Sequence, residues 1–220
     1  MHESFFADWV YWLIRSFVGP FVRLIWVKKV EGIENIPMKG PVIVAFNHQS
    51  YFDFICFIAV SPRNIHYLSA EKFFSHPLWN IVMKITGQIR VDRASRDKHE
   101  LHESVHAHLD AGKMIGIFPE GTRSPHREEM LKAFSGVVKY AIHKEACVIP
   151  VGIKGTYEVM SRHDTFPSFK KVVEMKIGKP ILFEKYHNCV VDEQILNNLT
   201  HGIMTEISKL SDKRYDHPPV

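Results

Sequence analysis

The stretch PVIVAFNHQSYFDFICFIAV, residues 41–60, contains the pattern that decides the fold of this chain. Its first six residues form a short apolar run, as expected for a buried strand. A second apolar run begins near Asp53 and fits a helix, whose dipole favours a negative charge in the first turn. The stretch therefore predicts a strand, a turn that contains His48, and a helix over residues 53–60.

The same alternation continues along the chain. Short apolar runs typical of buried strands cover residues 65–69, 88–91, 114–118 and 147–153. Helical segments are expected at about 77–85, 97–111, 135–144 and 192–210, and an edge strand or strand pair at 171–182. Strands that alternate with helices predict an α/β fold with a largely parallel central sheet flanked by helices.

Composition and charge limit the kind of protein. The chain has 220 residues, and its formal net charge of +4 favours acidic partners such as phosphate or anionic lipid. This charge is too small to indicate nucleic acid as a partner. The cysteines, Cys56, Cys147 and Cys189, are scattered and odd in number, which argues against a zinc site or a disulfide framework and fits a reducing compartment.

The N-terminal segment, residues 4–27, predicts an amphipathic helix at a membrane interface. Its polar or small residues recur at spacings of three and four in one narrow stripe, which consists of Ser4, Asp8, Tyr11, Arg15, Gly19 and Arg23. The rest of its surface is aromatic and aliphatic, with tryptophans suited to headgroup depth. Pro20 lacks an amide hydrogen and follows Gly19, so the helix should kink or split there. The alternative is an ordinary helix packed on the domain.

The same segment is not expected to span a membrane. Its longest charge-free stretch is far short of the ~18 residues that a spanning helix needs, and it lacks the basic start and the cleavage site of a signal peptide. We therefore expect a membrane-associated helical segment at residues 1–30 and one α/β domain at residues 31–220, with no linker between further domains.

His48 and Asp53 form the first candidate site. In open α/β sheets the turns at the carboxyl ends of strands line the binding crevice. A histidine there can take a proton from a substrate hydroxyl, and a nearby carboxylate can orient the ring and stabilise the imidazolium.

Two further segments with basic residues follow predicted strands. The run 114–118 leads into a loop that carries Glu120, Gly121, Thr122 and Arg123. Glycine lets the backbone approach a ligand closely, and the arginine fork suits phosphate oxygens. The run 88–91 ends next to Arg93. If these strands are parallel, their loops open on the same edge of the sheet.

Four sequence blocks resemble the glycerolipid acyltransferases, a family that includes the bacterial 1-acyl-glycerol-3-phosphate acyltransferases. The segment NHQSYFD at 47–53 matches the family's N-H-x4-D motif, and GQIRVDR at 87–93 is similar to its second block. The segments FPEGTRS at 118–124 and VIPVGIKGT at 148–156 resemble its third and fourth blocks. The blocks occur in the family's order and span the core of the chain.

The resemblance implies direct acyl transfer from a thioester to a glycerol hydroxyl, without an acyl-enzyme and without a bound cofactor. The donor would be acyl carrier protein or coenzyme A, and the acceptor a lysophospholipid, foremost lysophosphatidic acid. A peripheral location at the cytoplasmic face of a membrane is implied as well. A base worth ~10²–10⁴-fold, together with positioning, suffices because a thioester is already reactive.

The resemblance also implies a role for each candidate residue. His48 would be the general base and Asp53 its orienting partner. The phosphate of the acceptor would be bound by Arg93 and Arg123, in a site shaped by Glu120, Gly121 and Thr122. Many members carry a lysine after the phenylalanine of an F-K-x-G segment, where this chain has Ser135 in LKAFSGV. Lys132, on the other side of that phenylalanine, is the candidate replacement.

Other interpretations remain open at this stage. An acceptor such as lyso-ornithine lipid would need the two arginines less, and a non-catalytic membrane-binding module would need none of the motif residues. A serine hydrolase is disfavoured because no G-x-S-x-G motif is present. The spacing of His99, His102 and His106 would permit a metal site, but a solvated helix face is favoured because no fourth ligand is evident.

Overall fold

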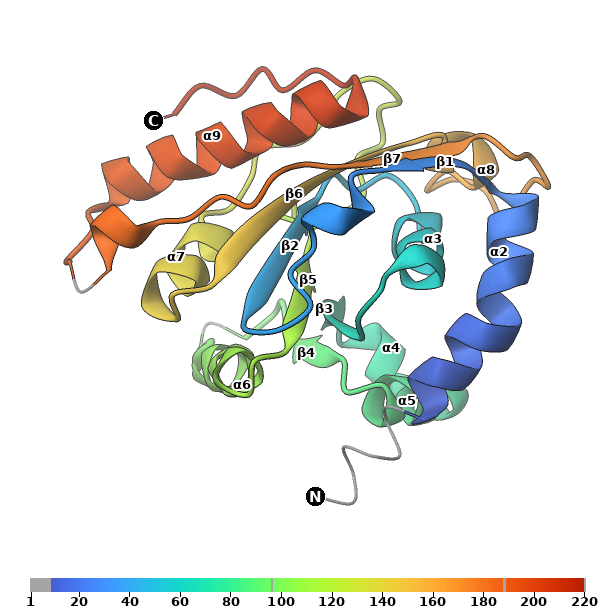
Figure 1. The fold of residues 1–220 in the computed structure, drawn as a ribbon, viewed down its shortest axis with the longest axis horizontal. Helices are drawn as coiled ribbons and strands as arrows, with labels where there is room; N and C mark the ends of the chain where they lie inside the picture. Colours follow the sequence, from blue (N-terminus) through green and yellow to red (C-terminus); the bar gives the residue numbers. More distant parts are fainter. Residues whose placement is uncertain (1–8, 96, 188, 220) are drawn as a thin grey trace.

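The computed structural model describes residues 9–95, 97–187 and 189–219, which fold around a seven-stranded sheet (Figure 1). The strand order is β1-β7-β6-β2-β5-β3-β4. The strands are β1 (Val27–Glu31), β2 (Val42–Phe46), β3 (Ile65–Ala70), β4 (Ile89–Val91), β5 (Met114–Ile117), β6 (Cys147–Lys154) and β7 (Val173–Ile177). The five strands from β6 to β4 are parallel, whereas β7 runs antiparallel to β6 and parallel to β1. The prediction of a largely parallel α/β sheet is confirmed.

Helices cover both faces of this sheet (Figure 1). The α-helices after the N-terminal region are α3 (Phe52–Val60), α4 (Lys72–Ser75), α5 (Pro77–Ile85), α6 (His99–Asp110), α7 (Gly136–His143), α8 (Thr156–Val159) and α9 (Glu193–Ser211). Two 3₁₀ turns, η2 (Ile33–Asn35) and η3 (Glu184–Tyr186), complete the connections. The expected long helices and strands are present, with ends that differ from the prediction by a few residues.

The central strand β2 explains the two-sided core. Val42, Val44 and Phe46 belong to a cluster with α3 and the N-terminal helix, whereas Ile43 and Ala45 belong to a cluster with α6, α7 and α9. Successive side chains of a strand point to opposite faces, so a strand buried on both faces needs a continuous apolar run. The sequence PVIVAF supplies that run.

Strand β1 was not expected from the sequence. Its residues VKKVE include two exposed lysines, and only Val27 is buried. An edge strand has one free side and little buried surface, so it carries no strong apolar pattern. Pairing with β7 in the register Val30↔Met175 makes it part of the sheet.

The N-terminal region is helical from residue 9 to Ile25, and the earlier part of the expected segment lies outside the described residues. A π-helical stretch, η1 (Ile14–Val18), precedes α2 (Gly19–Ile25). The amide of Gly19 donates to the carbonyl of Ile14, five residues back. The expected irregularity thus takes the form of a widened turn just before Pro20, whose missing amide leaves one carbonyl without its usual partner.

One face of this helix packs on the domain while the other is exposed. Tyr11 and Val22 are buried, and Gly19 lies against Ala59 of α3. The outward side chains are large and apolar: Trp9, Trp12, Phe17, Val18, Phe21 and Leu24. The described part of the helix thus packs on the domain, as in the alternative interpretation, and also has the expected apolar outer face. No helix in the described ranges is long and apolar enough to cross a bilayer.

Candidate active site

The site lies where two neighbouring strands end. β2 and β5 are parallel, with Ala45 opposite Ile117, so the segments that follow them leave the same edge of the sheet. The first segment carries His48 and the second carries Glu120, and the two residues are hydrogen-bonded to each other. Residues 72 positions apart in the chain are thus brought together by strand order.

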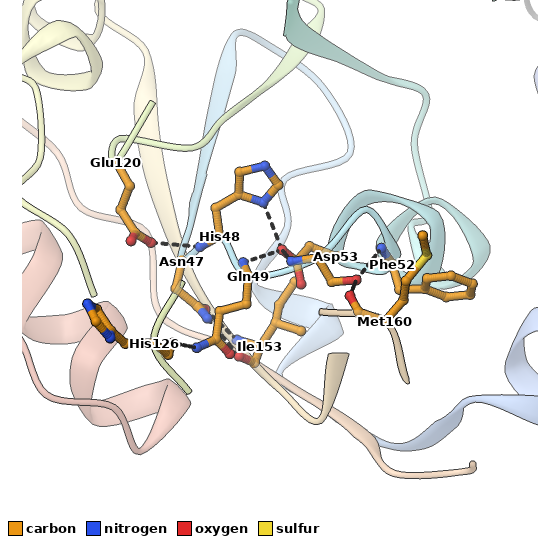
Figure 2. Close-up of polar contacts among 10 residues, drawn as sticks. Asn47, His48, Gln49, Phe52, Asp53, Glu120, His126, Ile153 and Met160 are labelled. Carbon is orange, nitrogen blue, oxygen red and sulfur yellow. Dashed lines mark hydrogen bonds and ion pairs between the residues drawn. The ribbon is translucent and has the colours of Figure 1, made fainter. Parts of the chain in front are cut away.

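His48 and Asp53 form a hydrogen-bonded pair (Figure 2). Nδ1 of His48 lies 2.8 Å from Oδ2 of Asp53, whose side chain is fully buried in the first turn of α3. The same oxygen accepts from the backbone amides of Gln49 and Ser50, at 2.8 and 2.9 Å. These donors hold the carboxylate in one orientation, so Nδ1 carries its hydrogen toward Asp53 and Nε2 is left as the basic nitrogen.

The imidazole is also held by an aromatic ring. Phe118, which directly follows β5, stacks on His48 with 4.0 Å between ring centroids and 25° between planes. Only 14% of the His48 side chain is exposed. A ring held on one face and at Nδ1 keeps little rotational freedom, which favours a fixed direction for Nε2.

The segment after β5 also fixes the backbone of His48. Its N–H donates to Oε1 of Glu120 at 2.7 Å, and its carbonyl accepts from the amide of Ser124 at 2.7 Å. Oε2 of Glu120 accepts from the amide of Leu131, also at 2.7 Å. Burial raises the pKa of Glu120 to about 8, although these two amide bonds oppose the rise. The Glu120 carboxylate thus links the backbone at His48 to the backbone at Leu131.

Neighbours of His48 anchor the turn to other segments (Figure 2). The side-chain amide of Asn47 both donates to and accepts from the backbone of Ile153 on β6, at 2.8 Å each. Nε2 of Gln49 donates to the carbonyls of His126 and Arg127. The side chains involved are buried, and a buried polar group needs such partners. The turn is thus tied to both β6 and the segment after β5.

Two cations flank Tyr51, three residues after His48. The guanidinium carbon of Arg123 lies 3.9 Å from the centre of the Tyr51 ring, and Nζ of Lys72 lies 2.9 Å from its hydroxyl. Lys72 opens α4 directly after β3, at the same edge of the sheet. Sequence reasoning missed both Tyr51 and Lys72. The available signal for Lys72 was its place as the first cation after a predicted strand.

Gly121 and Thr122 connect Glu120 to Arg123. Gly121 has a φ of 67°, which favours glycine, and a Cβ there would lie 3.0 Å from the ring of Phe134. Thr122 is half-buried beside it. The glycine thus permits a tight turn that directs Glu120 inward and Arg123 toward Tyr51.

Arg93 and Lys132 lie farther from this centre. Arg93 is exposed and follows β4, which is separated from β5 by β3, a displacement of about 10 Å at ordinary strand spacing. Lys132 is exposed and lines a cavity of about 550 Å³ between its own segment, α9 and the C-terminal residues. Neither side chain shares the contacts that hold His48.

Three histidines of α6, at positions 99, 102 and 106, contact other side chains or solvent. His102 Nδ1 lies 2.8 Å from the hydroxyl of Tyr140, His106 stacks on His143 at 4.6 Å, and His99 is exposed. Among the side chains that the structure describes, no group of three or more His, Cys, Asp and Glu residues is arranged to hold a metal ion.

Comparison with known proteins gives consistent matches. The sequence model of the Acyltransferase family matches residues 28–154, more than half of the chain. A 1-acyl-sn-glycerol-3-phosphate acyltransferase of Borreliella burgdorferi is 32% identical over 63% of this chain and 56% of its own length. One of Bacillus subtilis is 25% identical over 84% of this chain and 88% of its own length. The crystal structure of the 1-acyl-sn-glycerophosphate (LPA) acyltransferase PlsC from Thermotoga maritima has the same fold, with a TM-score of 0.75 and 23% identity over 96% of this chain and 83% of that chain.

Proposed function

The chain belongs to the acyltransferase family, and from this premise we propose that it moves a fatty acyl chain from an acyl thioester to the free hydroxyl of a lysophospholipid. Lysophosphatidic acid is the proposed acceptor and phosphatidic acid the product. The donor is acyl carrier protein or coenzyme A. The observation that carries the proposal is the 2.8 Å pair of His48 and Asp53 at the carboxyl end of β2.

The proposed reaction uses Nε2 of His48 as the base. As the acceptor oxygen attacks the thioester carbonyl, Nε2 takes the hydroxyl proton and Asp53 stabilises the imidazolium. The tetrahedral intermediate then collapses, the carbon–sulfur bond breaks, and the imidazolium returns the proton to the thiolate. The products are an ester and a free thiol, and no external base is consumed.

The proposed phosphate site lies around Tyr51. Arg123 offers a planar fork, and Lys72 offers a compact charge at the tyrosine hydroxyl. Arg93, two residues after β4, is the proposed third cation and would approach the acceptor phosphate from the edge of the sheet. Paired cations near a base suit an anionic acceptor better than a neutral one. Lys132 is the more distant candidate.

The proposed location is the cytoplasmic face of a membrane, where the protein binds peripherally. The support is the outward face of the N-terminal helix, with Phe17, Phe21 and Leu24 each more than 60% exposed. Burying such side chains in the interface contributes roughly 1.5–3 kcal/mol each before ordering costs. Residues 1–30 would then provide membrane contact and residues 31–220 the acyltransferase domain, joined through β1.

The test is an assay with purified protein that crosses both donors with several acceptors. Acyl carrier protein and coenzyme A thioesters are each offered to lysophosphatidic acid, a lysophospholipid with a larger headgroup, and lyso-ornithine lipid. We expect the fastest transfer to lysophosphatidic acid, and transfer at least ~10²-fold slower by His48→Ala prepared in parallel. Faster transfer to lyso-ornithine lipid would show that this lipid, and not lysophosphatidic acid, is the acceptor. Absence of transfer from every donor would leave a non-catalytic membrane module.

A further inference from the structure

Helix α5 exposes three large apolar side chains and contains one charged residue, Lys84. Trp79, Ile81 and Val82 are 50%, 56% and 40% exposed. Trp79 and Val82 are three residues apart and share one face of α5, and Ile81 lies next to Val82 around the helix. Single exposed apolar residues are ordinary, but several large ones on one short helix indicate a contact surface. The segments that lie next to α5 indicate what this surface contacts.

The first turns of the N-terminal helix are one neighbour of α5. Gln88 follows α5 directly, and its amide donates to the carbonyl of Met83 in that helix. Its side chain donates at 2.8 Å to the hydroxyl of Tyr11. In Figure 1 α5 lies beside the beginning of the N-terminal helix. The two helices, each with exposed apolar side chains, are thus neighbours in the molecule.

The loop 161–171 lies at the C-terminal end of the N-terminal helix. Trp26, which ends α2, donates through its indole to the carbonyl of Ser168 at 2.8 Å and stacks on Phe169. Phe166 and Phe169 are 82% and 77% exposed. We call this side the apolar edge, and its members are Trp9, Trp12, Phe17, Val18, Phe21, Leu24, Trp79, Ile81, Val82, Phe166 and Phe169.

The charges within the apolar edge are mostly positive. Its three segments, residues 9–25, 77–85 and 161–171, contain six basic residues and one acidic residue. The basic residues are Arg15, Arg23, Lys84, Arg162, Lys170 and Lys171. The acidic residue, Asp164, accepts from the backbone amide of Ser161. Apolar side chains with surrounding cations match the interface of an anionic bilayer.

A chain of aromatic rings connects α5 to the active site. Trp79 lies 6.4 Å from Phe73, and Phe73 lies 5.7 Å from Tyr51, between ring centroids. Tyr51 is the ring that Arg123 and Lys72 flank. Of the three segments, α5 is therefore linked through ring contacts to the residues that would bind an acceptor phosphate.

We propose that α5 is a second membrane-contact element, which enters the headgroup region of an anionic bilayer beside the active site. The N-terminal helix and the loop 161–171 complete the same contact surface. The purpose of this placement rests on the proposed function: a lysolipid acceptor leaves the bilayer next to Trp79 and meets Lys72 and Arg123 with its phosphate. A second copy of the chain fits the surface less well, because six cations and one anion on each copy would face each other.

The experiment uses the full chain with Ile81→Glu, which places a carboxylate at the exposed centre of α5. The matched control is Leu182→Glu, because Leu182 is similarly exposed at 59% and lies outside the apolar edge. Sedimentation with vesicles of phosphatidylcholine and phosphatidylglycerol, and of phosphatidylcholine alone, measures binding. We expect Ile81→Glu to bind the anionic vesicles about tenfold or more weakly than wild type. Leu182→Glu should stay within about twofold.

Activity assays distinguish this proposal from the proposed function. Ile81→Glu should lose turnover of vesicle-borne lysophosphatidic acid but keep that of a short-chain, monomeric acceptor. Equal vesicle binding by Ile81→Glu and Leu182→Glu would overturn the role of α5. A lipid-free dimer of the wild type that Ile81→Glu converts to a monomer would overturn it as well and assign the surface to a second copy. Vesicle binding without acyl transfer to any soluble acceptor would refute the proposed function and leave the membrane contact standing.

Discussion

The centre and the edge of the sheet end in very different ways at the same carboxyl side. After β2 and β5, His48, Asp53 and Glu120 are buried or nearly so, and each is held by at least one short hydrogen bond. After the edge strand β4, Arg93 is exposed to solvent. Both regions carry residues of the sequence blocks that resemble those of glycerolipid acyltransferases. The difference shows that a residue can belong to a sequence motif without being held in place by its neighbours.

The reason is the number of strands that pair with each strand. A central strand has a partner on each side, so the segments that leave it pack against segments from both partners. The turn at His48 contacts β6 through Asn47 and the segment after β5 through Glu120. An edge strand has one partner, so its following residues meet water. We therefore expect substitutions at the centre to change the rate of chemistry, and those at the edge to change acceptor binding weakly.

The largest expected effect is that of His48→Ala. Loss of the base should reduce kcat by ~10²–10⁴-fold, while the fold persists because the His48 backbone contacts to Glu120 and Ser124 remain. Steady-state kinetics measure kcat, and circular dichroism of the same preparation measures whether the fold persists. Near-normal turnover would assign the base elsewhere.

Glu120→Gln should have the next largest effect. The amide keeps one acceptor oxygen but presents an NH₂ group to the amide of either His48 or Leu131, so one of the two bonds is lost. We expect kcat to fall between about tenfold and about 100-fold with little change in either KM, since the backbone that carries the base shifts. An increase in acceptor KM at unchanged kcat would instead place Glu120 in substrate binding.

A pair of arginine substitutions compares centre and edge directly. Arg123→Lys removes the planar fork beside Tyr51 and should raise the KM for lysophosphatidic acid about three- to tenfold, with the donor KM unchanged. Arg93→Lys, the matched variant at the exposed edge, should raise it less, because the solvated cation is screened. An equal or reversed ranking of the two variants would contradict the comparison, and a change in donor KM would move Arg123 to the thioester side.

The smallest effect on activity is expected at His66, the second residue of β3, far from the carboxyl edge. Burial lowers the pKa of His66 to about 4, below the value of about 6.5 in an unfolded chain. Between these values the unfolded chain binds more protons, so stability is full above pH 6.5 and falls as the pH drops toward 4. The shift corresponds to about 3 kcal/mol.

The variant His66→Gln keeps a donor for the carbonyls of Thr86 and Gly87 but does not titrate. Its free energy of unfolding in urea should depend less on pH between 6.5 and 4 than that of the wild type. Its kcat at pH 7.5 should equal the wild-type value. An unchanged pH dependence of stability would show that His66 titrates normally in the folded protein.

Much of the fold could be predicted because its signals are local. β2, β5 and β6 have nearly continuous apolar runs, and β3 and β4 lie in shorter runs that each include a polar residue. Residues 171–182 were expected to contain β7. β1 was not predicted because its two exposed lysines interrupt the apolar pattern. The short helices α4 and α8 span four residues each, too few for a periodic pattern to appear. The N-terminal helix was predicted with its outer face, whereas its inner contacts through Tyr11 were not.

By itself, the sequence determined the parts of the site that depend on neighbours in the chain. His48 and Asp53 are five residues apart, across one strand–turn–helix junction, so their pairing follows from local geometry. The placement of Glu120 behind His48, of Arg123 and Lys72 around Tyr51, and of α5 beside the N-terminal helix was decided only by the tertiary structure. These contacts join residues 21 to 77 positions apart, and they exist because the sheet places β5 and β3 next to one another and β2 beside β5. Strand order arises from how whole helices and strands pack, and no short segment encodes it.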